Sequence, residues 1–97
     1  LNTPLDDGRK FYTDGPKIHK FLKELNENVF SKYKGKLTVG EMSSTSIDNC
    51  IKYTSPNEKE LNMSFSFHHL KVDYPNGQKW NLGRFDFIEL KKILTDW

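Results

Sequence analysis

Apolar and polar positions along the chain predict two short strands set between amphipathic helices. Residues 36–42 hold the first strand, in which Leu37, Thr38, Val39 and Gly40 lead directly into Glu41. A short apolar run is typical of a parallel strand buried on both faces, and α/β folds place their chemistry where such strands end. Glu41 is therefore a candidate functional residue. The alternative is a strand-end carboxylate that only faces water.

A helical pattern precedes this strand. It starts near Asp14-Gly15-Pro16, with Pro16 suited to the first helical position and Gly35 suited to the C-cap. Lys and Glu residues cover one face and predict a solvated surface. The apolar face repeats at helical spacing through Ile18, Phe21, Leu22, Leu25 and Val29. Residues 1–15 lack an apolar period and predict a loop.

A polar loop and a short helix follow Glu41. Thr45 is the predicted N-cap, with Asp48 at the third position, and Ile47, Cys50 and Ile51 form a thin apolar edge. No His or Asp pattern surrounds Cys50, so it is predicted as a small core residue and not as a nucleophile.

The second predicted strand, residues 61–67, alternates strictly. Its bulky positions are Leu61, Met63, Phe65 and Phe67, and its small polar positions are Asn62, Ser64 and Ser66. An ordinary half-exposed strand has this pattern. So does a barrel strand whose bulky side chains pack against outer helices while its small ones face the interior.

A last helix begins near Asp86, which is suited to cap it with Glu89 three residues on. Its predicted buried stripe is Phe87, Leu90, Ile93, Leu94 and Trp97. The order helix, strand, short helix, strand, helix predicts parallel pairing and an α/β class. Two strands do not close a sheet, and a TIM barrel needs ~250 residues. We therefore expect residues 1–97 to be part of a catalytic TIM barrel and not a complete independent domain.

Composition narrows the functional classes. The 97-residue chain has a net charge of +2, which is too small to indicate a nucleic-acid or membrane partner. No apolar run approaches the ~18 residues of a membrane span, and no signal peptide precedes the first predicted element. Cys50 is the only cysteine, so an intramolecular disulfide is impossible and a reducing, cytoplasmic setting is expected.

Candidate chemistry gathers where the two strands end. Glu41 follows the first strand, and His68, His69 and Lys71 follow the second. A carboxylic acid can protonate a leaving group, and His and Lys can hold an anion or a sugar hydroxyl. Consecutive strand residues point to opposite faces, so the His pair does not favour a metal site. No phosphate loop or zinc signature occurs, and no cofactor is expected.

These residues resemble a known family. Val39-Gly40-Glu41-Met42 is similar to the fifth-strand segment of the alpha-amylase family of retaining glycoside hydrolases. Residues 15–22 resemble the preceding helix of its oligo-1,6-glucosidase-like branch. Residues 40–46 and 67–75 resemble the members that act on trehalose 6-phosphate, and the run His-His-Leu-Lys-Val-Asp-Tyr-Pro is the most specific part. The resemblance extends from about Tyr12 to Trp97.

The resemblance implies a partial TIM barrel from roughly its fourth to its sixth helix, in a cytoplasmic enzyme that hydrolyses trehalose 6-phosphate to glucose and glucose 6-phosphate. Glu41 would be the general acid/base, and His68, Lys71 and Lys79 would bind the phosphate, with His69 as a structural neighbour. The alternative for these basic residues is a solvated surface.

The family's nucleophilic Asp and its second essential Asp belong to segments that this sequence lacks, so the isolated chain is expected to be inactive. Its expected partners are a phosphorylated disaccharide and the remainder of the barrel, with self-association of the fragment through open strand edges. One alternative is a neutral-sugar alpha-glucosidase, for which Lys71 and Lys79 would have no use. The other is a free-standing, non-catalytic binding module.

Overall fold

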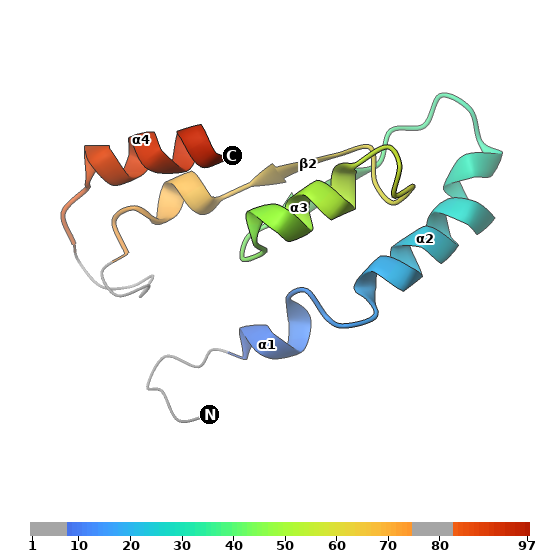
Figure 1. Ribbon diagram of the computed structural model, residues 1–97, viewed down its shortest axis with the longest axis horizontal. Helices are drawn as coiled ribbons and strands as arrows, with labels where there is room; N and C mark the ends of the chain where they lie inside the picture. The colour runs from blue at the N-terminus through green and yellow to red at the C-terminus, as the bar shows by residue number, and fades with distance from the viewer. Residues whose placement is uncertain (1–7, 75–82) are drawn as a thin grey trace.

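The computed structural model describes residues 8–74 and 83–97. The predicted order of helix, strand, short helix, strand and helix is confirmed, and Figure 1 shows α3 lying alongside β2. A single turn, α1, lies where the sequence predicted only a loop. The elements are α1 (Arg9–Tyr12), α2 (Ile18–Asn28), the 3₁₀ helix η1 (Phe30–Lys32), β1 (Val39–Met42), α3 (Ile47–Thr54), β2 (Met63–Ser66), the 3₁₀ helix η2 (His68–Lys71) and α4 (Phe87–Asp96). Within these two ranges, no helix has both the length and the apolar character needed to cross a membrane.

Strands β1 and β2 are parallel, as predicted. Val39 pairs with Met63 and Glu41 pairs with Phe65. Side chains fix the start of this pairing, because the Thr38 hydroxyl and backbone N–H both donate to Asn62 Oδ1 at 2.9 Å. The Asn62 backbone N–H donates in turn to Thr38 Oγ1 at 2.9 Å. This reciprocal contact holds one register.

Helix α3 covers one face of the sheet. Cys50 Sγ lies 3.2 Å from Ser64 Oγ, so the small residues of β2 face the helix. Gly40 lies on the same face, where an added Cβ would come within 2.7 Å of Leu61 Cδ1 and 2.8 Å of Met42 Cε. The close approach of these side chains explains why a slim residue stands at this position.

The opposite face, which we call the open face, carries Val39, Glu41, Met63 and Phe65, all of them exposed. The prediction that β1 is buried on both faces is therefore wrong for this chain, since no described segment covers the open face. The suggestion that the bulky β2 residues pack against outer helices is also wrong, because Ser64 faces α3 instead.

The molecule is a slab of 47 × 32 × 18 Å. Its Cα radius of gyration is 16.1 Å, whereas a compact domain of this length has roughly 12.5 Å. Among the described residues only one apolar side chain, that of Tyr53, is fully buried. The predicted burial of both helical stripes is correspondingly wrong in part, because their faces lack a partner. The exposed stripe residues are Phe21, Leu25, Val29, Phe87, Leu94 and Trp97.

The helix ends match the prediction at Asp86 but not at the other predicted positions. Asp86 caps α4 as predicted, since its Oδ1 accepts from the backbone of Ile88 at 2.8 Å. Ser46, not Thr45, caps α3 and accepts from the backbone of Asn49 at 3.2 Å. Pro16 precedes α2 and is not its first residue. Gly35 has a φ of +73° but lies beyond η1, so it turns the chain toward β1 and does not cap α2.

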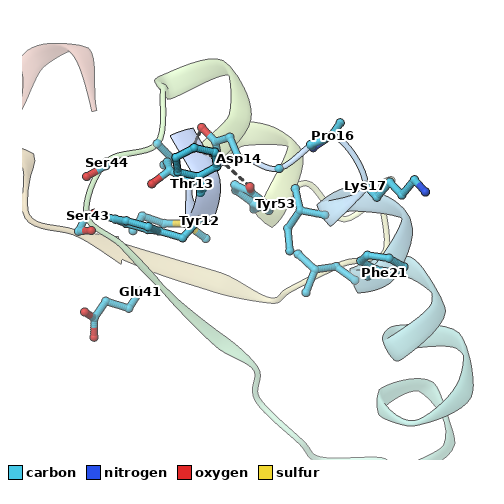
Figure 2. A pocket seen from close by; sticks show the side chains of 16 residues that line it. Tyr12, Thr13, Asp14, Pro16, Lys17, Phe21, Glu41, Ser43, Ser44 and Tyr53 are labelled. Atoms are coloured by element: carbon cyan, nitrogen blue, oxygen red, sulfur yellow. Dashed lines mark hydrogen bonds between the residues drawn. The ribbon is translucent and has the colours of Figure 1, made fainter. Parts of the chain in front are cut away.

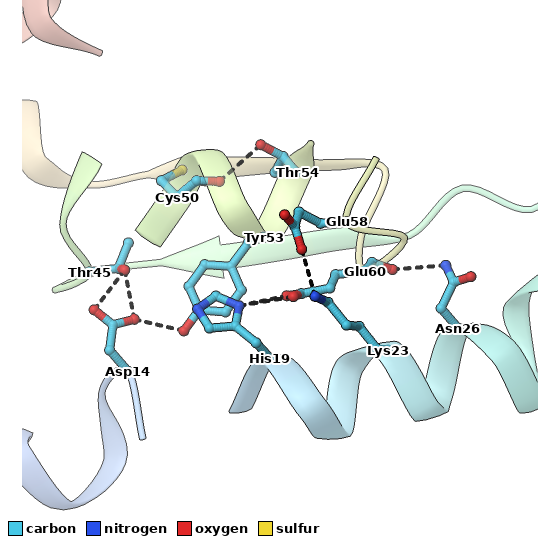
Figure 3. A network of polar contacts seen from close by, with 10 residues as sticks. All are labelled: Asp14, His19, Lys23, Asn26, Thr45, Cys50, Tyr53, Thr54, Glu58 and Glu60. Atoms are coloured by element: carbon cyan, nitrogen blue, oxygen red, sulfur yellow. Dashed lines mark hydrogen bonds and ion pairs between the residues drawn. The ribbon is translucent and has the colours of Figure 1, made fainter. Parts of the chain in front are cut away.

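Polar contacts attach α2 to the segment before β2, as Figure 3 shows. Glu60 is only 1% exposed, and its two carboxylate oxygens lie 3.0 and 2.9 Å from His19 Nδ1. Asn26 Nδ2 donates to the Glu60 carbonyl at 3.0 Å, and Lys23 Nζ donates to Glu58 at 2.6 Å in an exposed ion pair. The buried carboxylate therefore depends on α2 for its partner.

Replacing the partner of Glu60 should destabilise the protein. His19→Ala leaves a buried carboxylate without its side-chain donor, and we expect the free energy of unfolding to fall by about 1–3 kcal/mol in urea denaturation. Lys20→Ala is the matched control on the same helix, because its 3.9 Å pair with Glu24 is exposed; it should change stability by less than about 0.5 kcal/mol. Equal effects of the two substitutions would contradict this role for His19.

Candidate functional site

Glu41 stands near the carboxyl end of β1, on the open face of the sheet. Its register partner Phe65 lies beside it on β2. The Glu41 side chain is exposed, and Figure 2 shows its carboxylate pointing away from the helices. A carboxyl group in this position can exchange a proton with a molecule bound against the open face.

A pocket of about 560 Å³ lies on the other side of the strand. Figure 2 shows it between the segment that leads into α2 and the loop after β1, with Tyr53 among its lining residues. Glu41 borders this pocket, yet its carboxylate points away from it. The pocket and the carboxylate therefore do not form one site.

Lys71 ends η2 and reaches the loop that follows Glu41. Its Nζ donates to the backbone carbonyl of Ser43, two residues beyond Glu41. The backbone N–H of Phe67 also donates to the Met42 carbonyl, at 3.2 Å. The structure thus brings the ends of β1 and β2 to one edge, as the sequence predicted for parallel strands.

His68 is half-buried at the start of η2 and stacks on Trp97, with 4.1 Å between the ring centroids. Its Nδ1 is buried without a hydrogen-bond partner. Burial lowers the pKa of His68, and the nearby charge of Lys71 lowers it further, although a hydrogen bond to the Thr45 backbone acts in the opposite direction. The neutral imidazole is therefore favoured.

The remaining predicted site residues are His69 and Lys79. His69 is half-buried within η2. The expectation that the two His lie on a strand is wrong, because they begin a 3₁₀ helix. Lys79 lies outside the described residues. In the described parts of the chain, no group of three His, Cys, Asp or Glu side chains is arranged to hold a metal ion.

Sequence reasoning missed a cluster around Asp14. Thr45 Oγ1 donates to Asp14 Oδ1 at 2.7 Å and lies 2.8 Å from Oδ2, and the Tyr53 hydroxyl donates to Oδ1 at 2.7 Å (Figure 3). Thr45 had been predicted as a cap, and Tyr53 was left out of the apolar edge of α3. The three-residue spacing of Ile47, Cys50 and Tyr53 was the available signal that Tyr53 faces inward.

Electrostatics in this cluster favour an ionised Asp14. Burial acts to raise the pKa of its carboxyl group, but hydrogen bonds from Tyr53, Thr45, Asn49 and the Ser46 backbone outweigh burial and hold the pKa below its usual value. Burial, reinforced by the Asp14 charge, raises the pKa of the Tyr53 hydroxyl well above its usual value. Asp14 is thus a charged acceptor and Tyr53 a neutral donor.

Comparison with known proteins gives consistent matches. Residues 2–97 match the family described as alpha amylase, catalytic domain. The chain is 66% identical over 99% of its length to a trehalose-6-phosphate hydrolase of Bacillus subtilis. It is 55% identical over 94% of its length to one of Escherichia coli, and 44% identical over 91% to an oligo-1,6-glucosidase of Heyndrickxia coagulans. It spans only 16–17% of the length of these relatives.

Solved structures agree. A trehalose-6-phosphate hydrolase of Bacillus licheniformis, solved as the R201Q mutant in complex with PNG, superposes on 98% of this chain with a TM-score of 0.85 and 62% identity. A second structure of the same Bacillus licheniformis hydrolase gives a TM-score of 0.81. In both, the chain corresponds to 17% of the solved chain.

The lowered pKa of His68 predicts a pH dependence of stability. The unfolded chain takes up a proton near pH 6.5, whereas the folded chain does so only at lower pH. The contribution of His68 should therefore be complete above about pH 6.5 and should decline as the pH falls below that value. We expect the difference in unfolding free energy between the native protein and His68→Gln to shrink between about pH 7.5 and pH 5.5 in urea titrations. A difference that stays constant with pH would contradict this assignment.

Proposed function

Because this chain belongs to the alpha-amylase catalytic-domain family, we propose that it is the central segment of a retaining glycoside hydrolase that splits trehalose 6-phosphate into glucose and glucose 6-phosphate. Its two parallel strands and their helices are part of a TIM barrel. The observation that carries the proposal is the position of Glu41, near the carboxyl end of a barrel strand and on the open face, where TIM-barrel enzymes keep their catalytic groups.

Glu41 acts as the general acid and then as the base. Its carboxyl group gives a proton to the glycosidic oxygen while the C–O bond breaks and an Asp carboxylate from the fourth strand, outside this chain, bonds to the anomeric carbon. Water then attacks that carbon, the Glu41 carboxylate takes the proton of the water, and the bond to the Asp breaks. Retention requires the two carboxyl groups to lie ~5–5.5 Å apart.

The phosphate group explains the basic residues after β2. A phosphate dianion needs fixed positive charge and several donors, which Lys71 and Lys79 supply as ammonium groups. Neutral His68 adds a hydrogen bond and no charge. Support comes from the contact between Lys71 and the Ser43 carbonyl, which keeps the ammonium group beside the loop that follows Glu41.

The remainder of the barrel supplies what this chain lacks. The nucleophilic Asp and the second essential Asp come from other segments, so residues 1–97 constitute a fragment of the catalytic domain and need the parent enzyme for activity. We place that enzyme in the cytoplasm, which the lone Cys50 supports. No cofactor is needed for this mechanism, since the two carboxyl groups and water complete it.

A neutral-sugar alpha-glucosidase is the second candidate. The similarity to oligo-1,6-glucosidases favours it, at 38–44% identity over nine-tenths or more of the chain. The two candidates share Glu41 as the acid and differ in the use of Lys71 and Lys79. Substrate choice therefore separates them.

Glucose release will test the proposal. The parent enzyme should hydrolyse trehalose 6-phosphate, and act at least about 100-fold less efficiently on trehalose and isomaltose, because the neutral sugars lack the charged group that the basic residues bind. Glu41→Gln in the parent should lower kcat by at least about 100-fold, and the 97-residue chain alone should release no glucose.

Two results would count against this assignment. Preferential cleavage of isomaltose by the parent would move it to the neutral-sugar glucosidases. Turnover by the isolated chain would show that the carboxylates outside it are dispensable.

Removing the charge of Lys71 should affect only phosphorylated substrates. Lys71→Ala in the parent should lower kcat/KM for trehalose 6-phosphate by about 10- to 100-fold, which corresponds to the loss of one charged hydrogen bond. Activity on an aryl glucoside without phosphate should change by less than about threefold. Lys34→Ala is a matched control, as an exposed lysine remote in sequence from both strand ends. An equal loss on both substrates would assign Lys71 to the loop alone.

A further inference from the structure

The loop after β1 is held by side chains from two directions. On one side Lys71 donates to the Ser43 carbonyl, and on the other side Asp14 accepts from Thr45. We propose that Asp14 is a positioning residue for the general acid Glu41, acting through Thr45 and Tyr53. This inference rests on the proposed function of the chain.

The contacts of Asp14 are short, and the residues that donate them are buried. Both hydrogen bonds to its Oδ1 measure 2.7 Å, and their donors belong to Thr45 and Tyr53, which are 5% and 4% exposed. Thr45 belongs to the loop, and Tyr53 is the buried residue of α3. One carboxylate therefore fixes both the loop and the helix into which the loop runs.

The backbone of Asp14 carries a cost. Its φ is +48°, in the left-handed region, which is uncommon for non-glycine residues although Asp adopts it more readily than most. The hydrogen bonds to Thr45 and Tyr53 are the contacts that hold it. Such strain is a feature of residues whose position matters to a site.

The loop continues directly from the strand that carries Glu41. Backbone pairing fixes β1 only as far as Met42, whose carbonyl accepts from Phe67. Thr45 lies four residues after Glu41, and Ser46 already caps α3. A shift at Thr45 is therefore transmitted to the strand end, and a displacement of about 1 Å in a catalytic group can cost about 100-fold in rate.

Attachment of α2 accounts for only part of the cluster, through the Tyr53 ring, whose centroid lies 4.7 Å from that of the His19 ring. Helix α2 has its own anchors, namely the contacts of His19 and Asn26 with Glu60 and the ion pair of Lys23 with Glu58. Asp14 precedes the helix, and its hydrogen bonds to Thr45 and Tyr53 involve none of these residues. Its loss should therefore leave α2 in place and release the loop.

The test compares two leaving groups in the parent enzyme. Trehalose 6-phosphate releases a sugar hydroxyl that needs a proton from Glu41, whereas 4-nitrophenyl 6-phospho-alpha-glucoside releases a phenolate that does not. Asp14→Ala and Thr45→Val should each lower kcat/KM for trehalose 6-phosphate by about 10- to 100-fold and for the nitrophenyl substrate by less than about threefold. Thr45→Ser keeps the hydroxyl, so its kcat/KM for both substrates should stay close to that of the native enzyme.

The control variant is assayed on the same two substrates, and kcat/KM on each also decides the contrary outcomes. Lys23→Gln removes the exposed ion pair on α2 and should change neither value. An equal fall on both substrates in Asp14→Ala and Thr45→Val would overturn the positioning role and leave the proposed function intact. If Asp14→Ala does not fold, Tyr53→Phe replaces it, with the same selective loss expected. A native parent inactive on both substrates would overturn the proposed function itself.

Discussion

Parallel pairing of β1 with β2 is the constraint on which the rest of the molecule depends. It brings two segments that are 24 residues apart in sequence to one edge, so that the loop after Glu41 meets η2. It also decides which side chains α3 covers and which remain on the open face. Because side chains alternate along a strand, a slip of one residue in β1 would turn Glu41 toward α3. The reciprocal Thr38–Asn62 contact prevents that slip and so fixes the direction of the carboxylate.

Periodicity predicted the elements better than their burial. The spacing of apolar residues located α2, α3 and α4, and short-range chemistry located the cap at Asp86. The prediction of burial was wrong because burial depends on a packing partner, and the spacing of apolar residues does not say whether that partner is present. Phe65 has the pattern of a core residue, yet it is 46% exposed on the open face. The predicted N-cap of α3 was wrong by one residue. The Thr45 hydroxyl donates to Asp14, 31 residues away, and Ser46 caps the helix instead.

The candidate site was predictable to the extent that it follows from strand direction. Glu41 and Lys71 both follow from the rule that parallel strands end at one edge, whereas the roles assigned to them come from family resemblance. Asp14 and Tyr53 were not predictable in this way. Their hydrogen bond joins residues 39 apart, across a crossover whose geometry no local spacing encodes. His68 was identified as a basic residue, but its burial against Trp97, which favours the neutral form, required the structure.

The same long separations set the order in which the chain assembles during synthesis. Strand β1 leaves the ribosome before β2 exists, so Val39 has no parallel partner among the described residues until Met63 has followed. Asp14 cannot form its hydrogen bonds until Thr45 and Tyr53 have been synthesised. Closing each of these loops costs conformational entropy before the new contact contributes any stabilising free energy. The edge of β1 that receives β2 therefore stays unpaired for at least the time needed to translate the crossover. Until β2 has been made, that edge is open to pairing with a strand of another chain.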